Sequence, residues 1–200
     1  MNSLHSRLRE ATRAAHHALD HHPVLVPLVR GGLTHQGYAD ALQALHSIYF
    51  PLENVLCTAA VAKGFDYGGR LKHPALEADL KDLGRVPRAT FPKVPPPKNA
   101  GALIGMLYTL EGSTLGGQVI QRILSTGPCS RFPMRFFSGY GGNTLAHWQE
   151  FLEFAEMVCP VDEIEDACFA AVAVFELIKQ QCDEVIKECA SCSASTVLAG

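Results

Sequence analysis

The sequence predicts an all-α protein with a single domain. Its 200 residues are 48% hydrophobic and 18% charged, the balance of a globular chain long enough to bury a substantial core. Apolar residues recur at three- and four-residue intervals almost throughout, which is the spacing of amphipathic helices. We find neither an alternating strand pattern nor a repeat period. The same composition excludes disordered, collagen-like and coiled-coil chains.

The first half of the chain contains three predicted helices. Strong helical stripes span Leu4–Leu19 and Tyr38–Leu56, and a weaker one spans Pro74–Leu83. Residues 85–99 hold five of the twelve prolines. Because proline lacks an amide donor and favours extended backbone, we expect this segment to be a loop within the domain.

The second half begins with a long, glycine-rich apolar helix over residues 100–124. A break at Gly127-Pro128 and a short segment to Tyr140 follow, and another helix begins near Asn143. These elements continue the all-α pattern.

A last helix is expected to begin at an Asp162 N-cap, with Glu165 three residues further on, and to end near Glu188. The residues after it are small and polar. We therefore assign residues 1–188 to one helical domain and residues 189–200 to a flexible C-terminal tail.

Charge is divided unevenly along the chain. Residues 1–149 carry 15 basic and 9 acidic side chains, whereas residues 150–200 carry 2 and 11. A basic body favours an anionic ligand or an acidic partner, but the Lys/Arg clusters are too sparse for nucleic acid.

We expect no signal for export or membrane insertion in these residues. Arg7, Arg9 and Glu10 interrupt the stretch where a signal peptide would be apolar, and no run reaches the length of a membrane span. The seven cysteines are an odd number and are expected to be mostly reduced. We expect a cytoplasmic protein with no membrane partner.

The glycine-rich helix needs a physical reason, because a glycine inside a helix costs about 1 kcal/mol relative to alanine. At 100° per residue, Tyr108, Gly112 and Gly116 lie on one face, which offers bare backbone. The neighbour on that face is either a closely packed helix or a large flat ligand, and the spacing leaves both open. Glu111, which we interpret as a structural or solvated carboxylate, disfavours a membrane dimer motif.

The first helix carries Arg9 and His16, whose side chains share a face about 10 Å apart. That separation suits a planar cofactor, since an imidazole ligates a central iron and a guanidinium binds a carboxylate at the rim. Two alternatives stay open. His16 is a solvated side chain beside a surface arginine, or the doublets His16-His17 and His21-His22 form a non-haem metal site.

Two segments, taken together, resemble the heme oxygenases. Leu8–His16 (LREATRAAH) and Tyr108–Gly117 (YTLEGSTLGG) are similar to the proximal and distal helix signatures of that family, and Phe136–Gly141 and Trp148 follow in similar order. The resemblance is closest to the bacterial, biliverdin-producing branch associated with bacteriophytochromes. It implies a single-domain heme oxygenase-like fold with haem between a proximal helix and a kinked distal helix.

The resemblance implies haem-binding roles for matching residues of the proximal side. His16 is identified as the proximal iron ligand. Arg9 and Tyr108 stand where the family binds haem propionates, and Thr12 lies in the same signature. Arg135 is a further candidate for binding a propionate.

On the distal side, the resemblance implies that Gly112, Gly116 and Gly117 let the helix lie over the other haem face. Ser113 stands where animal members carry a carboxylate and is expected to be a polar contact. Gly112, Ser113 and Gly116 form the candidate catalytic set. A wall of backbone would steer oxygen toward the ring edge, and small hydroxyls would order water.

By this resemblance, haem b is both cofactor and substrate, and the products are biliverdin, carbon monoxide and ferrous iron. The expected partners are molecular oxygen, a ferredoxin or flavoprotein reductase as electron donor, and a bacteriophytochrome that receives biliverdin. A non-catalytic haem carrier or sensor of the same fold is the alternative function, and a helical scaffold with another ligand is a third. Gln149 and Glu153 depart from the family, which often has basic residues there.

Overall fold

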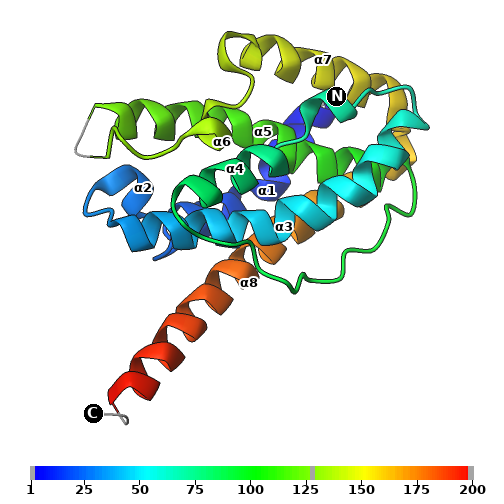
Figure 1. The fold of residues 1–200 in the computed structure, drawn as a ribbon. Coiled ribbons are helices and arrows are strands. Elements are labelled where there is room, and N and C mark those ends of the chain that lie inside the picture. The colour runs from blue at the N-terminus through cyan, green and yellow to red at the C-terminus, as the bar shows by residue number, and fades with distance from the viewer. Residues whose placement is uncertain (1–2, 127–128, 198–200) are drawn as a thin grey trace.

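The computed structural model describes residues 3–126 and 129–197, and within these ranges every regular element is helical (Figure 1). The all-α prediction is confirmed. The helices are α1 (Leu4–Asp20), α2 (Pro27–Arg30), α3 (His35–Val61), α4 (His73–Asp82), α5 (Ala100–Ser125), α6 (Arg135–Ser138), α7 (Thr144–Val158) and α8 (Ile164–Val197). The predicted Gly127-Pro128 break lies outside the described residues. No helix in the described ranges is both long and apolar enough to cross a membrane.

Three of the long helices begin at side-chain caps. Ser3, Thr34 and Asn99 each accept a hydrogen bond from the amide three residues further on, at 3.2, 3.0 and 2.9 Å. Such caps satisfy amide donors that the first turn of a helix leaves free. The start of α5, the glycine-rich helix, is thereby fixed at Asn99.

The start of α8 corrects one prediction. Asp162 is not its N-cap but lies in a short 3₁₀ turn, Val161–Glu163, and α8 begins at Ile164. The turn serves α5 instead, because the Glu163 carboxylate accepts the Gly101 amide at 2.7 Å. The 3₁₀ turn thus ties the two longest helices of the second half together.

At its other end, α8 runs past residue 188 to Val197 and projects away from the rest of the chain (Figure 1). The proposed boundary at residue 188 therefore falls inside a helix. The flexibility assigned to residues 189–200 stays a prediction.

Acidic side chains of α8 pair with the basic half of the chain. The pairs are Glu165 with Arg7, Asp166 with Lys98, and Glu188 with Arg88. Each surface pair contributes little to stability alone. Together they show that the uneven charge is partly balanced inside the molecule, which weakens it as an argument for an external partner.

Residues 85–99 form no helix, as their prolines predict. Gln43 donates to the Val86 carbonyl at 3.2 Å, and the rings of Phe91 and Phe50 are 4.9 Å apart. The segment is therefore packed on the helical body.

Two glycines bring the backbone of α5 into contact with the 3₁₀ turn and with the start of α8. A Cβ added at Gly101 would lie 2.2 Å from the Glu163 carbonyl oxygen, and one at Gly105 would lie 2.0 Å from that of Ala167. Real Cβ atoms do not approach so closely. For these two positions the close-packing interpretation of the glycine pattern is confirmed.

Candidate functional site

α1 presents His16 to solvent with one ring nitrogen already engaged. Its Nδ1 lies 2.9 Å from Oδ2 of Asp20, one turn further along the helix, and its side chain is 62% exposed. The ring lies 5.6 Å from that of Phe175 on α8. A histidine held through Nδ1 by a carboxylate has its Nε2 lone pair available to a metal. Asp20 is absent from the sequence-predicted site, although its i+4 spacing indicates it.

Three predicted residues gather one turn toward the N-terminus of α1. Thr12 is buried and donates to the Leu8 carbonyl at 2.8 Å. Burial raises the pKa of Tyr108 on α5, while the neighbouring Thr12 hydroxyl and Arg9 guanidinium oppose that rise. Arg9 is exposed. The Arg9 guanidinium and the Tyr108 hydroxyl, from two helices, form a donor pair suited to a carboxylate, whereas the Thr12 proton is already donated to the Leu8 carbonyl.

The three glycines predicted to face haem have different surroundings. A Cβ at Gly116 would meet nothing within 4 Å, whereas one at Gly112 would lie 3.6 Å from the Trp148 ring. At Gly117 it would come within 3.3 Å of the α6 backbone. Gly116 and Ser113 are exposed. The open part of the bare face is therefore centred on Gly116.

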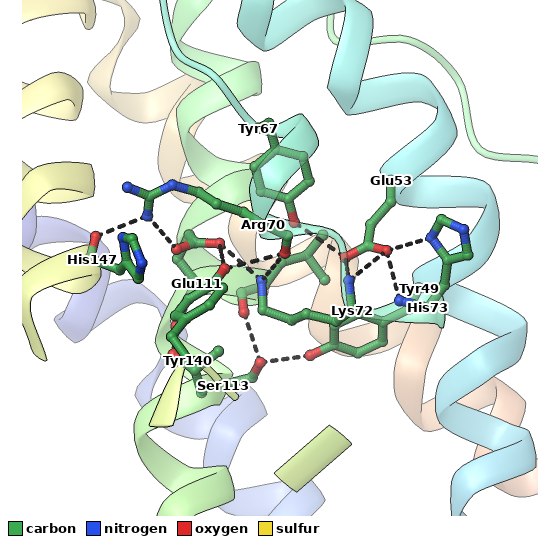
Figure 2. A network of polar contacts seen from close by, with 12 residues as sticks. Tyr49, Glu53, Tyr67, Arg70, Lys72, His73, Glu111, Ser113, Tyr140 and His147 are labelled. Atoms are coloured by element: carbon green, nitrogen blue, oxygen red, sulfur yellow. Dashed lines mark hydrogen bonds and ion pairs between the residues drawn. The ribbon is translucent and has the colours of Figure 1, made fainter. Parts of the chain in front are cut away.

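Ser113 is tied to α3 by Tyr49 (Figure 2). The serine hydroxyl donates to the Leu110 carbonyl at 2.7 Å and lies 2.5 Å from the Tyr49 oxygen, so the phenol is the donor between them. Burial raises the pKa of Tyr49, which keeps the phenol protonated at neutral pH. Tyr49 belongs to the apolar stripe of its helix, so the sequence pattern predicts only a core residue at this position.

A buried ion cluster holds the opposite side of α5 (Figure 2). Oε1 of Glu111 accepts hydrogen bonds from Lys72 at 2.8 Å and Tyr140 at 2.7 Å, and Oε2 accepts one from Arg70 at 3.0 Å. The Glu111 side chain is 1% exposed. Charges this deeply buried persist only when paired and hydrogen-bonded. Glu111 is therefore a structural carboxylate, one of the two roles predicted for it. Nothing in the sequence pattern indicates Arg70 or Lys72 as its partners.

The segment that carries these two cations is fixed by Glu53 of α3. This buried carboxylate accepts the amides of Lys72 and His73 at 2.8 and 2.9 Å, and lies 2.7 Å from the Nδ1 atom of His73. Its charge sits at the N-terminus of α4, where the helix dipole favours an anion. The hydrogen bond to Glu53 raises the pKa of His73.

Arg135 forms ion pairs with α4. Its guanidinium pairs with Asp79 at 2.9 Å and Asp82 at 2.7 Å, both on α4. It also lines a surface cavity of about 460 Å³, and a second cavity of about 330 Å³ lies beside Gln118 and Arg122. No other residue predicted to bind haem lines either cavity. Both contacts use Nη1 alone and the Arg135 side chain is 53% exposed, so its role in binding a propionate stays a prediction.

The residues of α1 and α5 fit haem by their donor types and exposure. His16 offers Nε2 to an iron, and Arg9 and Tyr108 offer donors to carboxylates. Gly116 leaves a stretch of backbone without a side chain to obstruct a flat ring. In the described residues, no group of three or more His, Cys, Asp or Glu side chains could hold a metal ion by itself. The fold and this arrangement together fit the class of all-α haem-binding proteins with a single histidine ligand.

The chain belongs to the heme oxygenase family: the family model described as "Heme oxygenase" matches residues 2–184. A heme oxygenase of Xanthomonas campestris is 38% identical over 100 residues, which are 48% of this chain and 58% of that protein. The matched stretch is thus a little over half the length of that relative. The family prediction is confirmed, and its biliverdin-producing, bacteriophytochrome-associated branch stays a prediction.

Solved heme oxygenases share the fold. The Neisseria meningitidis enzyme, solved with NO and CO bound, superposes with a TM-score of 0.76 at 23% identity and 92% coverage of both chains. Heme oxygenase-1 of Synechocystis, solved in complex with heme, gives 0.70 at 15% identity, covering 98% of this chain and all of that one. At these identities the comparison supports the architecture alone.

Proposed function

We propose that this protein is a heme oxygenase that opens haem b to biliverdin, carbon monoxide and ferrous iron, using molecular oxygen and external electrons. The observation that carries the proposal is the exposed His16, held by Asp20, together with the bare Gly116 face of α5 in a chain of this family. When bound, haem supplies both the iron at which oxygen is reduced and the macrocycle that is oxidised.

On the proximal side, His16 would hold the iron through Nε2. The Asp20 carboxylate keeps the proton on Nδ1 and fixes the direction of the ring. Arg9 and Tyr108 would bind the propionates, and the buried Thr12 hydroxyl would support Tyr108 from its own helix. Arg135 would be a further, weaker contact, because Asp79 and Asp82 already share its Nη1 atom.

On the distal side, Gly116 would give the ring and oxygen access to backbone. Gly112 would present bare backbone beside the Trp148 ring, and Gly117 would allow the close approach of α6. The Ser113 hydroxyl, fixed by Tyr49, would order water and hold a proton near the reacting edge. A neutral hydroxyl pair supplies protons without a strong acid, which favours attack on the ring over peroxidase chemistry.

Titration with hemin tests the proximal assignment. The expected result is a Soret shift that is lost or altered in His16→Ala and preserved in His17→Ala, the adjacent exposed histidine. An identical spectrum for His16→Ala and the unaltered protein would remove His16 as the axial ligand.

Turnover tests the activity. Addition of ferredoxin and its reductase under air should abolish the Soret band while a biliverdin spectrum grows and carbon monoxide is released. A stable complex that decays to ferric haem without biliverdin would identify a carrier or sensor instead. Adding an apo-bacteriophytochrome to the reaction tests the proposed acceptor, since its assembly with the released pigment is visible as a red-shifted band.

A further inference from the structure

Glu111 immediately precedes the Gly112-Ser113 step of α5. Two residues turn a helix by 200°, so Glu111 and Ser113 lie on opposite sides of α5. Ser113 is exposed on the proposed distal face, while Glu111 is buried among Arg70, Lys72 and Tyr140. The Glu111 carboxylate therefore anchors one side of α5, and Ser113 of the candidate site lies on the opposite side of the same helical turn.

The glycines next to Glu111 cannot hold the helix in place themselves. Gly112 and Gly116 contribute no side-chain packing, and a Cβ atom at Gly116 would meet nothing within 4 Å. In this stretch, the polar anchors on neighbouring elements are Glu111 and Ser113, and the network carries both (Figure 2). Glu111 has the stronger set, because three donors meet one buried carboxylate and two of them are charged.

The partners of Glu111 are anchored in turn. Arg70 also binds Glu150 at 2.5 Å and the His147 carbonyl at 3.0 Å, both on α7. The Lys72 amide is held by Glu53 of α3. One carboxylate thus ties the glycine-rich part of α5 to α3, α4 and α7 through a chain of hydrogen bonds whose centre is buried. Removing one partner from such a buried set leaves an unpaired charge and is strongly destabilising.

We propose that Glu111 is a positioning residue for haem opening: through Arg70 and Lys72 it fixes the backbone from Gly112 to Gly117, and so determines which edge of the macrocycle is attacked. The inference rests on the proposed function. It differs from a merely structural role, which would lower stability without changing how the site is arranged.

The first test uses the haem-free protein. Glu111→Gln keeps the side-chain shape but removes the charge that Arg70 and Lys72 share. Amide hydrogen exchange at residues 112–117 should rise by about tenfold, more than elsewhere in α5. Thr109→Val is the matched control, because it removes a buried 3.2 Å hydrogen bond from the same helix to the Ala171 carbonyl, on the α8 side. Exchange that rises equally in both variants would overturn the proposal.

The second test uses the hemin complex. In Glu111→Gln, the distribution of biliverdin isomers should change, and the pH of the spectral transition of the ferric complex should shift, while Thr109→Val retains both. If Glu111→Gln does not fold, Lys72→Met provides the same readouts. Unchanged isomers and transition in a variant that binds hemin would overturn the positioning role. Absence of biliverdin from the unaltered protein would instead contradict the proposed function, and the exchange test would still stand.

Discussion

Tyr49 of α3 donates a 2.5 Å hydrogen bond to the hydroxyl of Ser113 on α5, across 64 residues of sequence. This bond joins the buried middle of α3 to the exposed, glycine-rich side of α5. The Ser113 hydroxyl is thereby held in one orientation, in which it donates its hydrogen bond to the Leu110 carbonyl. The orientation of that hydroxyl is a property of α3 as much as of α5.

Replacing Tyr49 with Phe should lower the free energy of unfolding by about 1 kcal/mol and slow biliverdin formation, because the Ser113 hydroxyl loses its donor. Urea unfolding and single-turnover rates measure the two effects. Tyr38→Phe is the control, since Tyr38 is also buried on α3 and donates to the Pro133 carbonyl at 2.6 Å. Equal loss of rate in both variants would show that the Tyr49 bond has no specific role.

Asp20→Asn should weaken hemin binding by about tenfold, because the carboxylate no longer holds the Nδ1 proton of His16. Hemin titration followed at the Soret band gives the affinity. Glu10→Gln removes an exposed carboxylate of the same helix that pairs with Arg13, and should leave the affinity unchanged. A loss of the same size in Glu10→Gln would mean that helix charge, and not the His16 contact, sets the affinity.

Two glycine substitutions on α5 should have opposite effects on stability. Gly116→Ala should stabilise the haem-free protein by up to about 1 kcal/mol, because the added methyl meets open space and alanine favours helix. Gly105→Ala should destabilise it by about 1–3 kcal/mol, because the methyl would strike the α8 backbone.

Thermal unfolding without haem compares the two glycine variants. Gly116→Ala should nonetheless reduce turnover, since the methyl occupies the proposed ligand face. Retention of full turnover by the bulkier Gly116→Leu would contradict the assignment of that face.

The pH dependence of stability should carry a contribution from His46. Its side chain is 2% exposed, and burial lowers its pKa despite the opposing Glu77 contact. The pKa of His46 in the unfolded state is about 6.5. Below that pH the unfolded state binds a proton at His46 that the folded state does not bind, so the free energy of unfolding falls as the solution is acidified.

Urea unfolding at pH 7.5, 6.5 and 5.5 should therefore show a steeper loss for the natural protein than for His46→Gln. His73 acts in the opposite direction, because Glu53 raises its pKa and its contribution is lost as pH rises. A parallel decline in the natural protein and His46→Gln would remove His46 as the source.

The long helices were predictable where apolar residues recur at helical spacing. The stripe over Leu4–Leu19 became α1, which buries one face, and that over Tyr38–Leu56 became α3, which is buried on more than one side. The short helix α2 (Pro27–Arg30) has no periodicity to detect. The predicted N-cap at Asp162 was wrong. The neighbouring Glu163 accepts a hydrogen bond from the Gly101 amide of α5, and no local sequence signal indicates this contact between distant segments.

The site was predictable to the extent that its residues lie in contiguous motifs. His16 and Ser113 belong to such motifs, whereas Tyr49, Arg70 and Lys72 come from separate segments and meet Ser113 or Glu111 only after folding. The glycine pattern was ambiguous for a physical reason. Closely packed helices and a flat ligand both require bare backbone, and α5 packs on α8 through one part and leaves Gly116 open in another.

At Gly105 the backbone of α8 lies so close to α5 that no side chain fits between the two helices. A larger residue at this position therefore requires the two helices to separate. The stretch around Gly116 has open space instead, so a larger neighbour there needs no movement of α8.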